Sequence, residues 1–292
     1  MKQIGFIGVG IMGRPMVRNL MKNGYDVHIF ARNRAKVEDV ISEGAVFHDT
    51  IAECVNGRDA VITIVGYPQD VEEVYFAKGN ILDSAEPGTY LIDMTTTAPS
   101  LEEKIAACAA ERDLPFLDAP VTGGEAGAKA GTLSILVGGK EECFESCREI
   151  FMAMGKTISY YGPSGCGQHA KLANQILQAS ILSGVCESMA YAQKKGIDLN
   201  RFLTSTGAGS SQNSIMDRYG ERIIAGDMNP GFFIDLLIKD MQLGYDSAAE
   251  SALELPNLKL TLDHYRQLSK QGLGKKGMQA LIKYYLRDIE ED

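Results

Sequence analysis

The chain has 292 residues, of which 45% are hydrophobic and 23% charged, and its formal net charge is −9. This composition is that of an ordinary globular protein with one large domain or two, and the negative charge argues against a nucleic acid as partner, because phosphate backbones attract basic surfaces. No apolar run approaches the ~18 residues needed to span a bilayer, and the chain begins directly with a strand pattern rather than a signal peptide, so we expect a cytoplasmic protein that does not bind membranes.

The six cysteines form no Cys-x-x-Cys pair, and the four histidines are scattered along the chain. Cys143 and Cys147 lie one helical turn apart, but no histidine or second cysteine pair completes a set of metal ligands. We therefore expect no metal site, and we expect the cysteines to be reduced, as is usual in cytosolic proteins.

The first predicted element is a strand over residues 4–7, and it leads into the glycine motif Gly8-Val9-Gly10-Ile11-Met12-Gly13. A helix pattern follows, and then a second strand over 27–30. In such a unit the first glycine permits a tight turn, the second lets the backbone approach a pyrophosphate, and the third lets helix and strand pack closely. The helix N-terminus presents N–H groups to the phosphates. The alternative is a glycine-rich turn in another α/β fold. The predicted cofactor contacts in this motif are Gly8, Gly10, Ile11, Met12 and Gly13.

The end of the second strand reads Ala31-Arg32-Asn33-Arg34, with Lys36 beyond. NAD-binding units usually carry an acidic residue here for the ribose 2′-hydroxyl, whereas an arginine accommodates the 2′-phosphate of NADP. No acid stands at this strand end, and a guanidinium grips phosphate through two hydrogen bonds. We predict NADP as cofactor, with Arg32 as the main contact beside Ala31. NAD is the alternative, in which case these arginines are solvated surface charges.

The rest of the first half alternates between strand and helix patterns. This alternation predicts a mostly parallel, doubly wound Rossmann-type sheet, in which ligands sit at the carboxyl ends of the strands. The further strands are predicted over 60–65, 90–93, 115–118, 133–137 and 157–161, and the helices over 36–42, 69–76, 101–112 and 141–154.

The alternation ends at the glycine-rich stretch 162–167. A long helix without proline is predicted over 168–195, and only helical patterns follow, at 199–205, 214–224, 233–253, 259–270 and 277–290. We therefore predict a dinucleotide-binding domain over 1–163 and an all-helical domain over 164–292, entered through the long helix. The acidic end, 290–292, is predicted to fray.

Four polar residues of the long helix stand at positions i, i+3, i+4 and i+7, and so share one stripe: Lys171, Asn174, Gln175 and Gln178. The rest of that helix is apolar or small on most faces, which predicts burial. The stripe is then either hydrogen-bonded to other helices, with a lysine that reaches solvent, or it lines a cleft. Hydride transfer to a carbonyl needs a proton carrier, and a lysine near apolar surface suits that task. We therefore predict Lys171 as general acid/base and Asn174 as the amide that holds the reacting group.

The segment 118–124 runs from a strand end into Thr122-Gly123-Gly124. One hydroxyl and successive backbone N–H groups make a plausible nest for a carboxylate. The alternative is an ordinary surface loop, in which glycine pairs are common.

Lys239 and Asp240 close an apolar run. They form either a surface ion pair that contributes little, or a cation for an anionic substrate together with the carboxylate that orients it.

Taken in order, these motifs resemble those of the β-hydroxyacid dehydrogenases, whose members include 3-hydroxyisobutyrate dehydrogenase and tartronate semialdehyde reductase (2-hydroxy-3-oxopropionate reductase). The resemblance covers essentially the whole chain. Residues 8–13 match the cofactor motif, 118–124 the substrate motif, 165–175 the catalytic motif and Lys239-Asp240 a later motif on the cofactor side.

On the substrate side, the resemblance implies that Lys171 is the catalytic acid/base and that Asn174 orients the substrate. The substrate carboxylate would lie on Thr122, Gly123 and Gly124. Most members carry serine where this chain has Thr122, so the hydroxyl is kept while the added methyl narrows the pocket.

On the cofactor side, the resemblance implies that Lys239 lies beside nicotinamide and substrate, with Asp240 helping to position it. Thr95 would be the family's cofactor-contact hydroxyl, and Val65 the apolar residue on the adenosine side. NADP-preferring members often read Asn-Arg-Thr where this chain reads Ala31-Arg32-Asn33. The family usually forms oligomers through the helical domains, so we expect a homodimer or homotetramer.

The expected function is hydride transfer between NADP(H) and a short β-hydroxy acid or its semialdehyde, a small carboxylate, as in 3-hydroxyisobutyrate dehydrogenase. Tartronate, glyoxylate and succinic semialdehyde are alternative substrates within the family. Imine-reducing relatives tend to lack the lysine that is present here, and relatives acting on sugar phosphates are much longer. Outside the enzymes, the alternative is a silent dinucleotide sensor, which would have no reason to keep Lys171 and Asn174 together.

Overall fold

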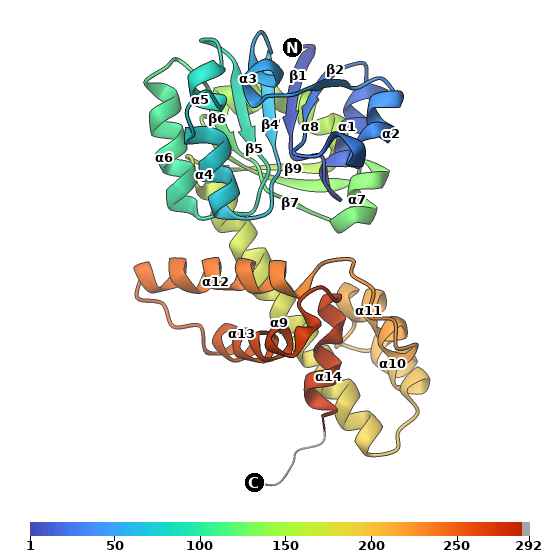
Figure 1. Ribbon diagram of the computed structural model, residues 1–292. Coiled ribbons are helices and arrows are strands. Elements are labelled where there is room, and N and C mark those ends of the chain that lie inside the picture. Colours follow the sequence, from blue (N-terminus) through green and yellow to red (C-terminus); the bar gives the residue numbers. More distant parts are fainter. Residues whose placement is uncertain (288–292) are drawn as a thin grey trace. The chain divides into compact units, whose positions relative to one another are not determined.

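The computed structural model describes residues 1–287, which fall into two compact units (Figure 1). The first unit is Met1–Lys171 and the second begins at Leu172. Helix α9 (Cys166–Lys194) runs unbroken through this division. The predicted domain boundary, near residue 163, lies just before α9.

The first unit is built on one nine-stranded sheet. Its strand order is β3-β2-β1-β4-β5-β6-β8-β7, with β9 paired to β8. The pairs from β3 to β6 are parallel, β8 runs antiparallel to β6 and β7, and β9 is parallel to β8. The order 3-2-1-4-5-6 is that of the doubly wound dinucleotide-binding sheet, with its switch point between β1 and β4. The strands are β1 (Gln3–Ile7), β2 (Asp26–Phe30), β3 (Val46–His48), β4 (Ala60–Thr63), β5 (Tyr90–Asp93), β6 (Phe116–Asp118), β7 (Val121–Thr122), β8 (Leu133–Gly139) and β9 (Gly155–Gly162).

Helices cover both faces of this sheet (Figure 1). One core cluster packs α1 and α8 against one face through side chains such as Leu20 and Phe151, and another packs α3 to α6 against the opposite face through Val71 and Ile105. Because both faces are buried, the central strands are continuous apolar runs rather than alternating ones. The helices are α1 (Gly13–Lys22), α2 (Glu38–Ser42), α3 (Ile51–Val55), α4 (Pro68–Phe76), α5 (Ile81–Ser84), α6 (Pro99–Ala110), α7 (Gly124–Ala130) and α8 (Glu141–Met154).

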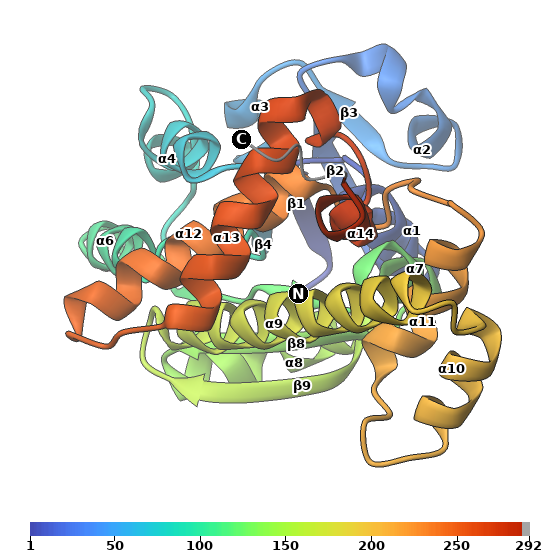
Figure 2. The same ribbon diagram turned by 90° about the horizontal axis from the view of Figure 1, so that it is seen from below.

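In its described part, the second unit contains helices joined by turns and loops, with one isolated β-bridge between Phe233 and Gly277. In both views α10 lies beside α11 and α12 beside α13 (Figures 1 and 2). Its core gathers Leu182 and Met189 of α9, Leu237 of α12, Tyr265 of α13 and Leu281. Besides α9, the helices are α10 (Leu199–Gly207), α11 (Ser214–Ile224), α12 (Ile234–Glu250), α13 (Pro256–Leu268) and α14 (Ile282–Tyr285).

The end of the chain differs from the prediction. The prediction of a single helix over 277–290 is wrong. A 3-10 turn (Met278–Leu281) leads into the short α14, which ends before Leu286. The remainder of that predicted helix and the acidic end at 290–292 lie outside the described residues. A π-helical turn (Ser269–Leu273) ends α13, and Gly272 in it has φ +83°, a value that favours glycine.

Among residues 1–287, no helix is long and apolar enough to cross a membrane. Within the same range no cluster of three or more histidine, cysteine, aspartate or glutamate side chains could hold a metal ion. All six cysteines are free thiols.

Candidate active site

The glycine turn lies at the switch point of the sheet, where β1 ends beside β4. Gly8 has φ +101°, and a Cβ there would lie 2.1 Å from the carbonyl oxygen of Ile64. A Cβ on Gly13 would lie 2.1 Å from the carbonyl oxygen of Gly8. At Gly10, in contrast, an added Cβ would meet no atom of residues 1–287 within 4 Å other than those of its chain neighbours. The fold itself therefore requires glycine at positions 8 and 13, while position 10 borders open space.

Helix α1 begins at Gly13, directly after the turn. No side chain caps its N-terminus, and no acidic residue stands in its first turn. The first N–H groups of a helix have no partner within the helix and attract anions. Together with the open space at Gly10, this end of α1 fits the pyrophosphate of a dinucleotide.

The other predicted cofactor residues follow the carboxyl ends of β1, β2, β4 and β5. Ile11 is 54% exposed, while Met12, Ala31 and Val65 are half-buried. Thr95 is fully buried: its hydroxyl donates to Asp93 Oδ1 (2.7 Å) and accepts from the backbone N–H of Val65 (3.0 Å). The Thr95 hydroxyl therefore ties the segment after β5 to the segment after β4.

The two arginines after β2 differ in their contacts. Arg34 lies over the ring of Phe47, with its Cζ 5.1 Å from the ring centroid. Its Nε lies 3.8 Å from Glu38 Oε2. The Arg32 side chain is 79% exposed, and its Nη2 lies 3.4 Å from Asp70 Oδ1 at the start of α4. Arg32 follows the last residue of β2, Phe30, by two positions.

The substrate motif forms the junction between β7 and α7. Thr122 ends β7, where it pairs with Ser134 of β8, and Gly124 begins α7. Gly123 and Gly124 have φ +131° and +64°, backbone conformations that side chains other than glycine rarely adopt. The glycine pair is therefore required by the local backbone rather than being part of an unstructured loop.

The start of α9 is fixed to the carboxyl end of β6. Asp118, the last residue of β6, accepts from the N–H groups of Gly165 (2.8 Å) and Gln168 (2.9 Å). Burial raises the pKa of Asp118 to about 6, although these two hydrogen bonds act in the opposite direction. Lys171 follows one turn after Gln168 and is only 6% exposed. The predicted catalytic lysine therefore lies at the carboxyl edge of the same sheet that carries the glycine turn.

The other predicted residues of the stripe lie in the second unit. Asn174 Nδ2 donates to Gln175 Oε1 (2.9 Å), and Gln175 Nε2 donates to Asp240 Oδ2 (2.7 Å). Lys239 Nζ lies 3.0 Å from Asp240 Oδ1, and the two side chains are 12% and 2% exposed. Asp240 is thus buried and Lys239 is mostly so, which differs from an exposed surface pair, and an inter-helix hydrogen bond joins Asp240 to the stripe.

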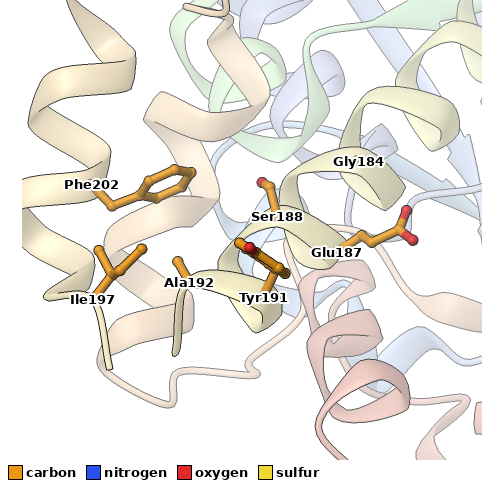
Figure 3. A pocket seen from close by; sticks show the side chains of 7 residues that line it. All are labelled: Gly184, Glu187, Ser188, Tyr191, Ala192, Ile197 and Phe202. Carbon is orange, nitrogen blue, oxygen red and sulfur yellow. The ribbon is translucent and has the colours of Figure 1, made fainter. Parts of the chain in front are cut away.

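A groove of about 490 Å³ lies elsewhere in the second unit, between the end of α9 and α10 (Figure 3). Its wall is mainly apolar, and the Glu187 carboxylate points away from Phe202. None of its residues was predicted to bind cofactor or substrate. The lining residues are Gly184, Glu187, Ser188, Tyr191, Ala192, Ile197 and Phe202.

The sequence reasoning missed three polar side chains that support the site: Asp93, Glu102 and Gln168, all fully buried. For Glu102 a signal exists, because Glu102, Ile105 and Ala109 stand at i, i+3 and i+7, so that an acid occupies a core position of α6.

The sheet order and the open glycine turn at the switch point define a dinucleotide-binding protein. The family model described as the NAD binding domain of 6-phosphogluconate dehydrogenase matches residues 3–162, and that described as NAD-binding of NADP-dependent 3-hydroxyisobutyrate dehydrogenase matches residues 165–285. The chain belongs to the β-hydroxyacid dehydrogenase family. It is therefore an NAD(P)-dependent oxidoreductase, with a nicotinamide dinucleotide as cofactor.

Two curated relatives and one solved structure illustrate this relationship. The chain is 43% identical to the uncharacterized oxidoreductase YkwC of Bacillus subtilis over 98% of its length and 99% of that protein. It is 37% identical to the NAD-dependent L-serine dehydrogenase of Pseudomonas aeruginosa, covering 98% of each chain. The 3-hydroxyisobutyrate dehydrogenase of Mycobacterium tuberculosis, solved with L-serine, superimposes with a TM-score of 0.90 at 27% identity, over 99% of this chain and all of that one.

Proposed function

We propose that the protein transfers hydride between NADP(H) and a short β-hydroxy acid or its semialdehyde, with Lys171 as general acid/base. The observation that carries this proposal is the position of Lys171: it is buried, and it lies on the helix start that Asp118 holds at the carboxyl edge of the sheet. Ligands of doubly wound sheets bind at that edge.

The bound cofactor supplies the hydride chemistry. The Gly8–Gly13 turn and the N-terminus of α1 hold the pyrophosphate. During reduction of a semialdehyde, the Lys171 ammonium donates a proton to the carbonyl oxygen as it becomes a hydroxyl; during oxidation, the neutral amine accepts that proton.

The remaining predicted residues bind and orient the substrate. Thr122, Gly123 and Gly124 hold the carboxylate through a hydroxyl and backbone N–H groups. Asn174 orients the reacting group. Lys239 supplies a positive charge to the anionic substrate, and Asp240 fixes its ammonium, which is supported by their 3.0 Å contact.

We propose NADP as the preferred cofactor. The six residues after β2, 31–36, include the exposed Arg32 and no acidic residue, which supports a contact between Arg32 and the 2′-phosphate. Because the relative from Pseudomonas aeruginosa is described as NAD-dependent, each activity should also be measured with NADH or NAD.

The substrate class is a small acid that carries its hydroxyl on the β-carbon. L-serine, named in the relative from Pseudomonas aeruginosa and in the solved structure from Mycobacterium tuberculosis, has that arrangement. An assay of NADPH oxidation with methylmalonate, tartronate and succinic semialdehydes and with glyoxylate, and of NADP reduction with 3-hydroxyisobutyrate and L-serine, would identify the substrate. Silence across this panel, with cofactor binding intact, would favour the dinucleotide sensor instead.

The role of Lys171 is tested by Lys171→Ala. We expect loss of turnover by at least about 100-fold, while the dissociation constant for NADPH stays nearly unchanged, because the lysine moves a proton and does not hold the cofactor phosphates. Lys194→Ala, at the exposed end of the same helix, is the matched control and should be fully active. Near-normal turnover by Lys171→Ala would reject the assignment.

We further propose that the enzyme is cytoplasmic and works as a homodimer or homotetramer. Large apolar side chains on the helical unit are exposed in the single chain, among them Leu177, Tyr191 and Ile197. Tyr191 and Ile197 also line one mainly apolar groove, and a contiguous exposed apolar surface is typical of a protein–protein contact. Sedimentation velocity would measure the assembly, and a monomer at micromolar concentration would reject it.

A further inference from the structure

Two carboxyl groups lie completely buried beneath the carboxyl edge of the sheet. Asp93 ends β5, Glu102 stands in the first turns of α6, and both are 0% exposed. Asp93 Oδ1 accepts from the hydroxyl of Thr63 (2.6 Å) and from the hydroxyl and N–H of Thr95 (2.7 and 3.1 Å). Glu102 Oε1 accepts from Gln168 Nε2 (3.0 Å). One oxygen of each carboxyl is therefore well supplied with donors.

The second oxygen of each carboxyl has no such supply of donors in the described part of the chain. Among residues 1–287, Asp93 Oδ2 and Glu102 Oε2 are both buried without an ordinary hydrogen-bond donor. Each of the two carboxyl groups nevertheless shifts the pKa of the other, so the two groups lie close together. Because a carboxylate can only accept, the two unpartnered oxygens can bond to each other only when one of the carboxyls keeps a proton to donate. Two ionised carboxylates in contact and out of water would repel strongly, whereas one proton converts the repulsion into a hydrogen bond.

Glu102 is the partner that keeps the proton. Burial raises the pKa of Glu102 well above its usual range, and the neighbouring Asp93 and Asp118 raise it further. Burial also raises the pKa of Asp93, but the donors from Thr63, Thr95 and Glu102 lower it. Four titratable side chains act on one another electrostatically here: Tyr75 of α4, Asp93 of β5, Glu102 of α6 and Asp118 of β6. The stable arrangement is a neutral Glu102 that donates to an ionised Asp93.

Gln168 connects this acid pair to the start of α9. Its Nε2 donates to Glu102 Oε1 and to the carbonyl oxygen of Thr95 (2.7 Å), and its Oε1 accepts from the N–H of Thr97 (3.1 Å). Both Nε2 and Oε1 of Gln168 are therefore hydrogen-bonded to the segment after β5, at Thr95 and Thr97. Lys171 follows on the next turn of the same helix.

We propose that Glu102 is a positioning residue of the enzyme: its carboxyl stays protonated at neutral pH, and through Asp93 and Gln168 it fixes the Thr95 segment against the helix turn that carries Lys171. The functional half of this proposal rests on the proposed role of Lys171. The protonation of Glu102 does not, since it concerns the folded chain without cofactor or substrate.

The first experiment measures unfolding by urea between pH 5 and 9 for the wild type and Glu102→Gln. Glutamine can donate to Asp93 and accept from Gln168, and so replaces a neutral glutamic acid. A folded-state pKa above the unfolded value makes folding take up a proton, so wild-type stability falls as pH rises through this window. The Glu102→Gln variant lacks this loss. The ratio of its unfolding equilibrium constant to that of the wild type should therefore decrease by up to about tenfold for each unit by which the pH rises.

The control is Glu111→Gln at the exposed end of α6, which should follow the wild type at every pH. A constant ratio for Glu102→Gln across the window, or a glutamine variant that loses stability relative to wild type at high pH, would show that Glu102 is ionised and overturn the proposal. The infrared carbonyl band of a protonated carboxyl, present in wild type at pH 7 and absent from Glu102→Gln, reads the same proton directly.

The second experiment tests positioning by comparing Glu102→Leu with Glu102→Gln. Leucine leaves Asp93 Oδ2 and one N–H of Gln168 without partners, so kcat should fall by roughly 10- to 100-fold through misplacement of the catalytic turn. Glutamine should restore kcat to within about threefold of the wild type at pH 7, since each donor and acceptor is replaced. Equal kcat for both variants would overturn the positioning role. A wild type inactive on every substrate would instead indicate failure of the proposed function, while the unfolding result would still stand.

Discussion

Gln175 of α9 donates a 2.7 Å hydrogen bond to Asp240 of α12, and both side chains are 2% exposed. Asp240 also lies 3.0 Å from Lys239, and Gln175 accepts from Asn174. The glutamine therefore links two residues proposed to bind substrate, Asn174 and Lys239, through a single buried carboxylate. A buried carboxylate is tolerated only when its oxygens are paired.

Gln175→Leu should weaken both folding and catalysis. The substitution leaves Asp240 Oδ2 buried without this donor, which costs about 1–3 kcal/mol of the free energy of unfolding. It also removes the acceptor that orients the Asn174 amide, so kcat should fall. Urea unfolding and steady-state kinetics measure the two effects. Gln178→Leu, one turn further along α9, is the control: the Gln178 amide donates to the weak acceptor Met278 Sδ at 3.4 Å, so this substitution should cost less stability. Equal losses would argue against a special role for Gln175.

Several features of this architecture could be predicted from the sequence because they depend on local patterns. The apolar runs that became β1, β4 and β5 are buried on both faces and need no tertiary information to identify. The short edge strand β3 and the two-residue strand β7 were missed. Strands of two or three residues carry no detectable period, and their pairing with β2 and β8 defines them.

Helix α7 was missed for a different reason. Its sequence, Gly-Glu-Ala-Gly-Ala-Lys-Ala, contains two glycines, which lower helix propensity by about 1 kcal/mol each. Packing of Ala128 into the core outweighs that cost. Local propensity therefore favoured a loop where tertiary contacts produce a helix.

Substitution of Arg32 and substitution of its partner Asp70 should change the preference between NADP and NAD in opposite directions. Arg32→Asp should weaken NADP binding by at least about tenfold and NAD binding much less, because only NADP carries the 2′-phosphate. Asp70→Asn removes a negative charge 3.4 Å from Arg32 while keeping an acceptor for the N–H of Tyr67. It should tighten NADP binding by about two- to fivefold, the range of an exposed ion pair. Fluorescence titration with NADPH and NADH measures both, and equal changes for the two cofactors would reject Arg32 as the phosphate contact.

The supporting side chains show where sequence reasoning stops. The stripe containing Lys171 and Gln175 was identified because both residues lie on one helix, where spacing determines which positions share a face. The partner of Gln175 lies 65 residues away, and Asp70 lies 38 residues from Arg32. Only the packing of separate elements brings such residues together, so the pairs could not be predicted from spacing.

The three glycines of the cofactor turn should differ in what alanine does to them. Gly13→Ala should unfold the first unit or prevent its folding, because the new Cβ would lie 2.1 Å from the Gly8 carbonyl oxygen and 2.9 Å from the Phe6 ring. The methyl group of Gly10→Ala would meet no atom within 4 Å in the described part of the chain apart from its chain neighbours, so thermal unfolding should match the wild type. Its NADPH affinity should nevertheless fall by about tenfold or more, since the methyl group occupies the space of the pyrophosphate. Unchanged affinity in a folded Gly10→Ala variant would show that the cofactor does not approach this glycine.

The pair His28 and His48 should make the first unit less stable in mild acid. His28 Nε2 lies 2.9 Å from Gln3 Oε1, an acceptor, so this nitrogen donates; His28 Nδ1 must then accept from His48 Nε2 at 2.8 Å. Protonation of His28 puts a proton on Nδ1, so that His48 must move its own proton from Nε2 to Nδ1 or two N–H groups oppose each other. Burial, with smaller contributions from Arg58 and His48, lowers the pKa of His28 to about 4.

A histidine with a lowered folded-state pKa binds fewer protons in the folded than in the unfolded chain. The free energy of unfolding should therefore decrease as the pH falls from about 6.5 towards 4, by on the order of 1 kcal/mol for this partly exposed group. His28→Asn should show less of this decrease. His169→Asn, which alters an exposed histidine, should keep the full decrease. Urea unfolding at closely spaced pH values measures the slopes, and an identical slope in His28→Asn and in the wild type would show that His28 is not the group that takes up the proton.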